Sequence, residues 1–300
     1  MLEGVVPFPP EFAARYRAKG YWQDKSLRDE FAAVFEKFGP RVCIIDRDRQ
    51  ITYAELDRLS TNLALNLLEL GFKPLDRVVP TLPNVAEFVI LYFALQKIGA
   101  IPIAALATHR YNEVSQFVRL SQAVACFYPE RQSDFEFAPM VKRVQQESPC
   151  CKFAITLGKP GPGELSLQEL IAKPAKLPRS ALDALKLDPT DPCIFQLSGG
   201  TTGIPKLIPR THNDYAYNSK RASEVCGVNG DSALQLGAPT SVECVSQVQA
   251  SKISFPVRGL IRLDFPARGG MPPVKVFFHD SAQPGDSEAF HVPGMEKMPV

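Results

Sequence analysis

The side chains best suited to chemistry are concentrated in one short segment, residues 197–206, which reads Leu-Ser-Gly-Gly-Thr-Thr-Gly-Ile-Pro-Lys. Its glycines allow positive φ angles, so successive backbone N–H groups can turn toward one point. Hydroxyl groups and a lysine ammonium converge on the same concavity, and this combination favours an anion. The segment therefore predicts a phosphate-binding loop, with candidate ligands Ser198, Gly199, Gly200, Thr201, Thr202, Gly203 and Lys206.

The spacing within this loop differs from the G-x-x-x-x-G-K-[ST] pattern of P-loop proteins. Lys206 follows Gly203 by three residues, and Leu207 stands where that pattern has Ser or Thr. A glycine-rich surface turn is the structural alternative, since a Gly-Gly pair alone is typical of one. The full run of glycines, hydroxyls and lysine favours phosphate binding instead.

The composition is that of a globular protein without a strong charge bias. The chain has 300 residues, of which 45% are hydrophobic and 22% charged, and its formal net charge is +2. This length allows one large domain or two smaller ones. No run rich in Lys and Arg, and no interleaving of basic with aromatic residues, suggests a nucleic-acid groove. We therefore expect no nucleic-acid partner.

The sequence also predicts no membrane association. An early acid, Glu3, and several prolines stand where a signal peptide needs basic residues followed by an apolar run. No stretch approaches eighteen uninterrupted apolar residues, the length that a membrane-spanning helix needs. We expect a cytoplasmic protein.

The cysteines are interpreted as small buried side chains in a reducing compartment. They are odd in number and scattered, without a C-x-x-C pair, so they predict no metal site. The neighbours Cys150 and Cys151 begin a predicted strand and would point to opposite faces, which disfavours a disulfide between them. The full set is Cys43, Cys126, Cys150, Cys151, Cys193, Cys226 and Cys244.

Hydrophobic periodicity predicts an α/β fold in which strands alternate with helices as parallel βαβ units. Thr52 with Glu55 forms a capping box before a leucine stripe that ends at Gly71. Pro80 within its strand suggests an edge or an irregularity. The predicted helices are 10–38, 53–70, 85–98, 111–121 and 139–146, and the predicted strands are 41–46, 78–82, 100–105, 123–128 and 151–157.

The phosphate loop is predicted to lie within a hairpin-like pair of strands, 193–197 and 207–211. A surface connection over 158–191, with one short helix at 165–172, leads into it. A helix follows from about residue 213 to 226. Its periodicity places Tyr215, Ser219, Ala222 and Cys226 on one face, and Lys220, Arg221 and Glu224 on the solvent side.

Two histidines lie beside predicted strand ends, where ligands collect in open parallel sheets. His109 follows the strand 100–105, and His212 follows the strand 207–211. A lone histidine in a loop is more often a capping or packing residue than a catalytic one. We therefore leave both histidines out of the predicted catalytic residues.

The loop and its extension, Leu207–Tyr215, resemble the signature of the adenylate-forming superfamily, and in particular the stand-alone aryl-acid adenylating enzymes of siderophore biosynthesis. The resemblance runs from about residue 7 to about residue 231. Further matching segments are Pro10–Ala13, Tyr16–Arg17, Lys19–Asp24 and Phe93–Leu95, with Lys97 and Gly99. A fatty acyl- or aryl-CoA ligase is a more distant alternative, which the Leu-Ile-Pro-Arg-Thr-His extension disfavours.

This resemblance implies the N-terminal domain of an adenylating enzyme that uses ATP and Mg²⁺. An aryl carboxylate, 2,3-dihydroxybenzoate or alternatively salicylate, attacks the α-phosphorus of ATP and releases pyrophosphate. The aryl group then passes to the phosphopantetheine thiol of an aryl carrier protein. Thr201, Thr202 and Lys206 are the implied direct phosphate ligands, with Lys206 stabilising the departing pyrophosphate.

The resemblance ends after Asp231. Pro239 falls on an expected proline, but Val242 and Glu243 stand where the family has a His-Asn pair that contacts the aryl acid. The later family motifs for adenine, ribose and Mg²⁺, and the catalytic lysine of the C-terminal domain, have no counterpart. The sequence is therefore divided into 1–231, a partial AMP-binding domain, and 232–300, a divergent and irregular tail.

We interpret the tail as the product of a frameshift or truncation, or as disordered, because pattern is lost abruptly after near-family sequence. A natural short protein with a new C-terminus is the alternative. Half of a nucleotide site holds phosphates without positioning the base, so we expect the chain to be inactive alone. A non-catalytic remnant of the family is thus the rival to an active ligase.

Overall fold

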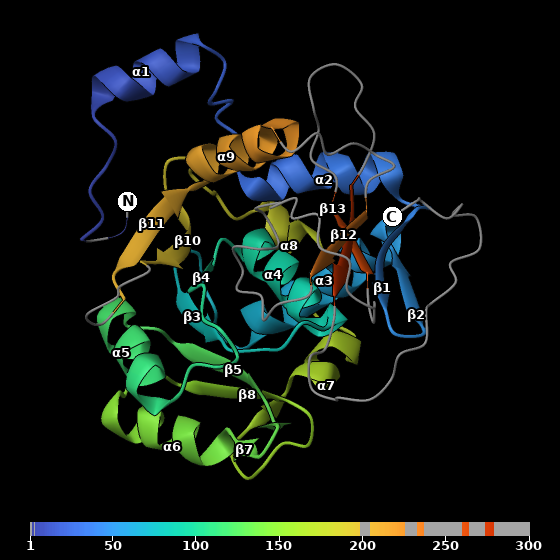
Figure 1. The fold of residues 1–300 in the computed structure, drawn as a ribbon, viewed down its shortest axis with the longest axis vertical. Helices are drawn as coiled ribbons and strands as arrows, with labels where there is room; N and C mark the ends of the chain where they lie inside the picture. The colour runs from blue at the N-terminus through green and yellow to red at the C-terminus, as the bar shows by residue number, and fades with distance from the viewer. Residues whose placement is uncertain are drawn as a thin grey trace, which may run out of the picture.

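The computed structural model describes Leu2, residues 4–198 and 205–225, and the backbone of three strands between residues 233 and 278. It confirms a mixed α/β fold built on a parallel sheet (Figure 1). The strand order of this sheet is β4-β3-β5-β8-β9, and every neighbouring pair is parallel. Its strands are β3 (Arg77–Pro80), β4 (Ile101–Pro102), β5 (Ala125–Pro129), β8 (Phe153–Leu157) and β9 (Leu165–Ser166).

Helices cover both faces of this sheet because successive strand side chains point to opposite sides. On β5, Ala125 and Phe127 join one hydrophobic cluster, and Cys126 and Tyr128 join the other. The first cluster contains α2 (Leu27–Phe38), α3 (Tyr53–Glu69), α4 (Ala86–Ile98) and α7 (Leu167–Ala172). The second contains α5 (Tyr111–Ser121) and α6 (Ala138–Glu147).

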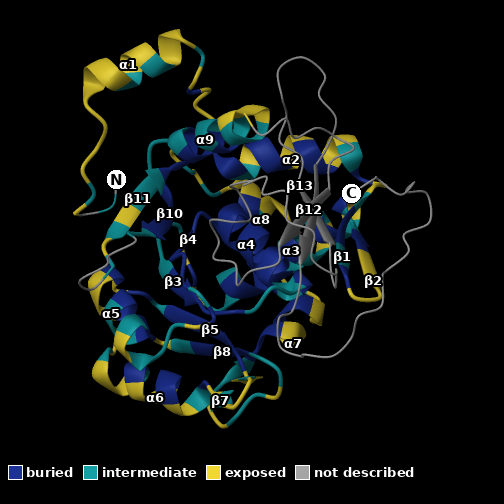
Figure 2. Ribbon diagram, viewed as in Figure 1, coloured by how far each residue is buried: buried dark blue, intermediate teal, exposed yellow. Residues whose placement is uncertain are grey.

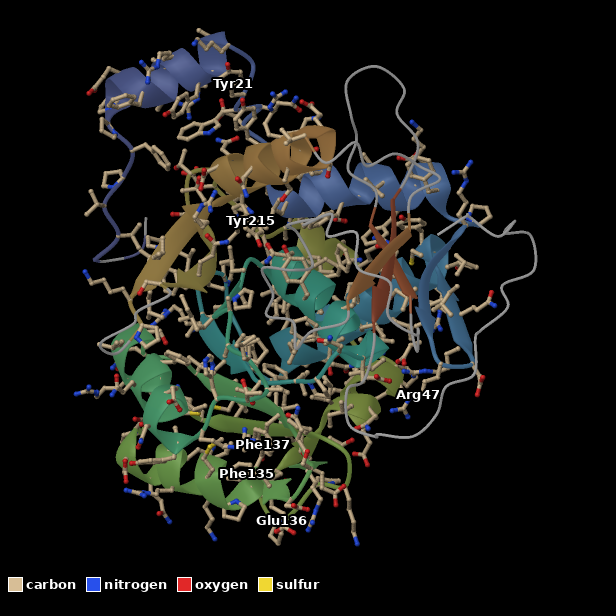
Figure 3. All side chains as sticks on the ribbon, in the orientation of Figure 1. Tyr21, Arg47, Phe135, Glu136, Phe137 and Tyr215 are labelled. Atoms are coloured by element: carbon tan, nitrogen blue, oxygen red, sulfur yellow. The ribbon has the colours of Figure 1, made fainter. Side chains whose placement is uncertain are left out.

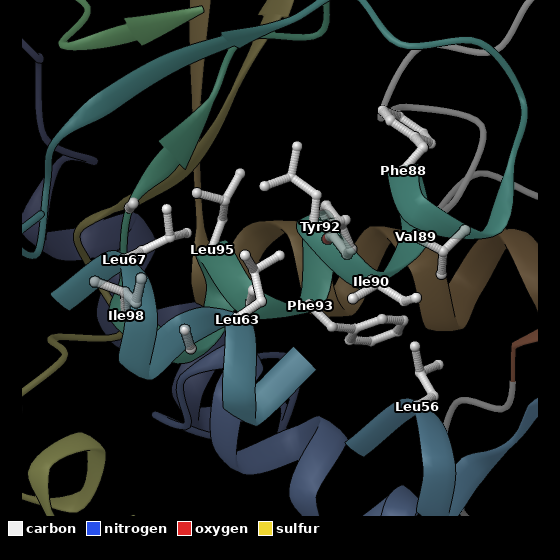
Figure 4. Close-up of a cluster of buried hydrophobic side chains, with 14 of the residues drawn as sticks. Leu56, Leu63, Leu67, Phe88, Val89, Ile90, Tyr92, Phe93, Leu95 and Ile98 are labelled. Carbon is white, nitrogen blue, oxygen red and sulfur yellow. The ribbon is translucent and has the colours of Figure 1, made fainter. Parts of the chain in front are cut away.

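Helix α4 is buried almost all round. Every residue in it except Glu87 is buried, as expected for a helix without a polar face (Figure 2). Its apolar side chains pack against Leu56, Leu63 and Leu67 of α3 (Figure 4). Thr52 accepts a hydrogen bond from the Glu55 N–H and so begins α3 as predicted.

The predicted helix 10–38 is wrong, because it breaks into α1 (Pro10–Ala18) and α2. Positive φ angles at Gly20 (68°) and Asp24 (51°) turn the chain between them, and Ser26 then caps α2 by accepting from the Asp29 N–H. No residue of α1 is buried. The aromatic residues of 10–38 divide in the same way: Tyr16 lies edge-on to Trp22 with ring centroids 5.4 Å apart, whereas Phe31 packs on Phe93 of α4 at 4.8 Å.

Two predicted strands differ in extent or position. Pro80 ends β3 without placing it at an edge, because β3 lies between β4 and β5 and pairing with β4 stops at Val78. Strand 100–105 shortens to β4, after which Ile103 makes a parallel bridge to Phe195. The predicted helix 165–172 begins as β9, and Ser166 then caps α7.

A second sheet lies beside the helices of the first hydrophobic cluster. This five-stranded sheet has the order β12 (Ala233–Leu236), β14 (Val274–Phe278), β13 (Leu260–Leu263), β1 (Val42–Asp46) and β2 (Arg49–Thr52), so β13 of the tail pairs with β1. The rest of 232–300 lies outside the described residues. In the described part of the chain, no helix is long and apolar enough to cross a membrane. Further short elements are β6 (Arg131–Gln132), β7 (Phe135–Glu136) and α8 (Ser180–Asp183).

The cysteines within the described residues are free thiols. Cys43, Cys126, Cys151 and Cys193 are buried and Cys150 is half-buried, which fits their interpretation as packing residues. Cys226 and Cys244 lie outside the residues whose side chains are described.

Helix α9 (His212–Val225) docks on α2 through buried polar groups. The His212 Nδ1 accepts a hydrogen bond from the Leu27 N–H at 3.1 Å, at the start of α2. Burial lowers the pKa of His212 to about 4. The prediction that Lys220 faces solvent is wrong, since its ammonium donates to buried Glu30 at 2.9 Å; Arg221 and Glu224 do lie at the surface.

We predict that Gly99→Ala destabilises the fold more than Gly71→Ala. Both glycines have left-handed φ angles, 81° and 95°, so each alanine strains the backbone by about 1–3 kcal/mol. A Cβ at Gly99 would also collide with Leu187, whereas one at Gly71 meets nothing within 4 Å. Urea unfolding measures both losses. Equal losses would show that the Leu187 collision costs nothing.

We also predict acid sensitivity from His212. Its folded pKa of about 4 lies below the ordinary value of 6.5, so the unfolded chain takes up the proton first. The free energy of unfolding should be full above pH 6.5 and fall between pH 6.5 and 4, by about 3 kcal/mol. Urea unfolding at pH 7, 6 and 5 measures this. His212→Gln keeps a neutral acceptor and should lose this part of the pH dependence; an unchanged pH profile would contradict the assignment.

Candidate functional site

The predicted phosphate loop is carried by an antiparallel hairpin, as the sequence predicts. The strands β10 (Pro192–Leu197) and β11 (Leu207–Thr211) pair up to Leu197 opposite Leu207, directly at the base of the loop. The apolar run of β10 is buried, which explains why it forms the inner strand. The hairpin therefore presents the loop at one end.

Helix α4 and the parallel sheet hold β10 from two sides. Ile103, just after β4, bridges to Phe195, and the Ala104 N–H donates to the Phe195 carbonyl at 2.8 Å. The buried Gln96 of α4 donates from Nε2 to the Cys193 carbonyl at 3.0 Å. The strand that enters the loop is thus fixed to the core.

Ser198 and Lys206 close the base of the loop. The Ser198 N–H donates to the Lys206 carbonyl at 3.0 Å, and the Lys206 N–H donates to Ser198 Oγ at 2.8 Å. The Ser198 hydroxyl keeps its own hydrogen to donate. The other predicted ligands, Gly199, Gly200, Thr201, Thr202 and Gly203, lie outside the described residues.

The Lys206 side chain is exposed at this point. Among residues 4–198 and 205–225, no carboxylate forms an ion pair with its ammonium. An exposed cation without an acidic partner is suited to bind an external anion such as a phosphate. Of the predicted ligands whose positions are described, Ser198 and Lys206 lie together.

His109 acts as a packing residue that satisfies a loop N–H, in line with its interpretation as a capping or packing residue. Its Nδ1 accepts a hydrogen bond from the Leu106 N–H at 3.0 Å, and its ring meets Phe117 edge-on. Burial lowers the pKa of His109, so the ring is neutral and acts as an acceptor. The neighbouring Arg110 packs over Phe135 of β7 and over Phe137, with its guanidinium 4.3 and 5.4 Å from the two ring centroids.

A buried charge lies in α4 at Lys97, which the sequence indicated only as part of the resemblance. The Lys97 ammonium pairs with Asp57 and donates to Thr61 Oγ1 at 2.7 Å, while Asp57 also pairs with Arg179 at 3.0 Å. Burial lowers the pKa of Lys97 to about 8. These residues line a cavity of about 90 Å³ beneath α2. Since Lys97 is held by protein oxygens, we interpret this cluster as structural.

The polar residues at the end of β11 and the start of α9 are also structural in their contacts. Arg210 donates to Gln196 Oε1 at 2.8 Å and pairs with Asp214, so it joins both hairpin strands to α9. From the sequence, Arg210 and Asp214 were noted only as part of the resemblance. A run of charged and amide side chains between a strand and a helix was the available signal of such contacts.

Known proteins resemble this chain over most of its length. The profile of the family described as AMP-binding enzyme matches residues 31–242. The chain is 37% identical to 2,3-dihydroxybenzoate-AMP ligase from Bacillus subtilis over 239 residues, which are 80% of this chain and 43% of that protein. It is also 37% identical to salicyl-AMP ligase / salicyl-S-ArCP synthetase from Mycobacterium tuberculosis, covering 77% of this chain and 41% of that one.

A solved structure agrees with these relatives. The apo structure of MbtA from Mycobacterium smegmatis superimposes with a TM-score of 0.71 at 36% identity, covering 79% of this chain and 43% of that chain. The chain thus spans less than half the length of the proteins that it matches. The resemblance drawn from the phosphate loop is confirmed, and the chain belongs to the AMP-binding enzyme family.

Proposed function

We propose that this chain carries the polyphosphate-binding part of a site for aryl-acid adenylation. In that reaction an aryl carboxylate attacks the α-phosphorus of ATP, forming an aryl-adenylate and releasing pyrophosphate. The observation that carries the proposal is the closed loop base, where exposed Lys206 lies beside Ser198 at the end of a hairpin fixed to the core. Membership of the AMP-binding enzyme family supports it.

The proposed substrate is 2,3-dihydroxybenzoate, with salicylate as the alternative. The named relatives for these two acids match this chain at the same 37% identity. We further propose that the product passes to the phosphopantetheine thiol of an aryl carrier protein. This step is supported by the second activity in the name of the Mycobacterium tuberculosis relative, salicyl-S-ArCP synthetase.

The proposed roles follow from where negative charge develops. Lys206 neutralises charge on the departing pyrophosphate, and Ser198 donates its hydroxyl hydrogen to a phosphate oxygen. Thr201 and Thr202 are the further proposed ligands, and backbone N–H groups of Gly199, Gly200 and Gly203 complete the set. A low-strain glycine loop also helps a site that must release its product.

Magnesium fits this proposal as a companion of ATP. Mg²⁺ is usually bound by one or two carboxylates, water and substrate phosphates. In the part of the chain that the structure describes, no group of three His, Cys, Asp or Glu side chains could hold a metal ion. The residues present therefore suit an ion that the phosphates bring with them, where it would neutralise phosphate charge.

For the 300-residue chain by itself we propose phosphate binding without turnover. Its residues 232–300 lack the family motifs for the adenine and aryl acid, and the chain spans 43% of the Bacillus subtilis relative. Holding the phosphates without orienting the other groups supplies little of the rate acceleration. ATP–pyrophosphate exchange with 2,3-dihydroxybenzoate and with salicylate tests this. Exchange above background with either acid would defeat the non-catalytic interpretation and identify the substrate.

We predict that Lys206→Ala weakens pyrophosphate and MgATP binding at least tenfold, which is about 1.4 kcal/mol. Lys206 is the only charged side chain in the segment 197–206. Isothermal titration calorimetry measures both affinities. Lys152→Ala removes an equally exposed lysine before β8, away from the hairpin, and should leave them unchanged. Equal affinities in the wild type and Lys206→Ala would remove the role proposed for Lys206.

A further inference from the structure

The junction of β11 and α9, residues 210–213, links three parts of the molecule. Arg210 extends to Gln196 of β10 and to Asp214 of α9. His212 holds the first residue of α2, and Asn213 holds Asp24, which precedes α2. Side chains of neighbouring residues thus tie the hairpin to α9 and to residues 5–26, which we call the N-terminal arm.

Arg210 bonds across the hairpin close to the loop. Its guanidinium donates to Gln196 Oε1 at 2.8 Å, and Gln196 lies two residues before Ser198. Gln196 also pairs directly with Ile208 across the hairpin. Among the described strands, β10 and β11 form a two-stranded sheet, and Phe195 of β10 also bridges to Ile103. Because β11 has only β10 as a strand neighbour there, side-chain bonds matter more for β11 than for a strand inside a wide sheet.

Asn213 connects the same segment to the N-terminal arm. The Asp24 N–H donates to Asn213 Oδ1 at 3.0 Å, and Asn213 Nδ2 donates to the Asp24 carboxylate at 2.9 Å. Asn213 is only 3% exposed. Arg17 of α1 grips the same carboxylate with two hydrogen bonds of 2.8 and 3.0 Å and lowers the pKa of Asp24.

A ring contact strengthens this connection. Tyr21 of the arm stacks on Tyr217 of α9 with ring centroids 4.5 Å apart. Figure 3 shows Tyr21 beside α9 and Tyr215 on the side of α9 that faces the core. Because α1 has no buried residue, the arm is attached through Val5, which packs against the second hydrophobic cluster, and along α9 and the start of α2.

We propose that Arg210 and Asn213 are positioning residues for the phosphate loop. Arg210 sets the spacing of the two strands at the loop base, and Asn213 makes that spacing depend on the N-terminal arm. Neither residue touches the phosphates. Displacing the arm therefore lowers the affinity of the loop for polyphosphate. This inference rests on the proposed function for its ligand, but its structural part does not.

The test measures amide hydrogen exchange and pyrophosphate affinity in the full 300-residue chain. Arg210→Lys keeps the charge but loses the planar contacts to Gln196 and Asp214. It should speed exchange in peptides covering 193–198 and 205–211 at least fivefold and weaken pyrophosphate binding three- to tenfold. Peptides of β5 should exchange as in the wild type. Arg221→Lys, on the exposed side of α9, is the matched control and should change neither readout.

A charge swap tests the connection to the arm. Asn213→Asp sets a second carboxylate against Asp24, so it should speed exchange in the hairpin as Arg210→Lys does. Combining it with Asp24→Asn restores a donor opposite an acceptor. The double variant should return hairpin exchange to within twofold of the wild type, which general destabilisation would not do.

The outcomes are distinct. Hairpin exchange unchanged in Arg210→Lys, exchange raised equally in β5, or no rescue by the charge swap overturns the inference. Pyrophosphate that fails to bind the wild type overturns the proposed function, and the exchange measurements still decide whether these residues position the hairpin.

Discussion

The structure depends on the burial of one helix that has almost no surface for solvent. Helix α4 must be covered on every side, because its residues other than Glu87 are buried. The parallel sheet, α2 and α3 supply that cover, and together they form the larger hydrophobic cluster. Its one lysine, Lys97, can remain inside only because Asp57 and Thr61 receive its hydrogen bonds. The order of elements around α4 follows from this requirement.

The proposed phosphate site inherits its rigidity from the same helix. Gln96 of α4 bonds to the backbone of β10, so the strand that leads into the loop is anchored in the most buried part of the molecule. Among the described residues, no α4 side chain bonds to the returning strand β11, which is held by its pairing with β10 and by the contacts of Arg210 with Gln196 and Asp214. A flexible glycine loop therefore joins one strand held by the core and one held through surface-proximal polar contacts. This asymmetry suits a loop that must both grip and release a polyphosphate.

Local features such as caps and hairpins could be predicted from the sequence, whereas most contacts between distant residues could not. The Thr52 cap, the Gly99 terminus and the hairpin around the loop could be predicted because each depends on neighbouring residues. Periodicity predicted one helix over 10–38, but positive φ angles at Gly20 and Asp24 break it. The sequence did not predict that the Lys220 side chain points inward, because its partner, Glu30, is 190 residues away. For the site, residue types identified the loop, whereas the contacts of Arg210, which span two strands and a helix, required the structure.

The position of these distant partners has a consequence for synthesis of the chain. Asp24 meets Asn213 across 189 residues, and Leu27 meets His212 across 185. At about 5–20 residues per second, a ribosome needs roughly 10–40 s to make the intervening segment. During that interval the first helix has emerged without the surface that will hold it, and its aromatic side chains are open to chaperones. The attachment of residues 5–26 thus has to wait until α9 has been made.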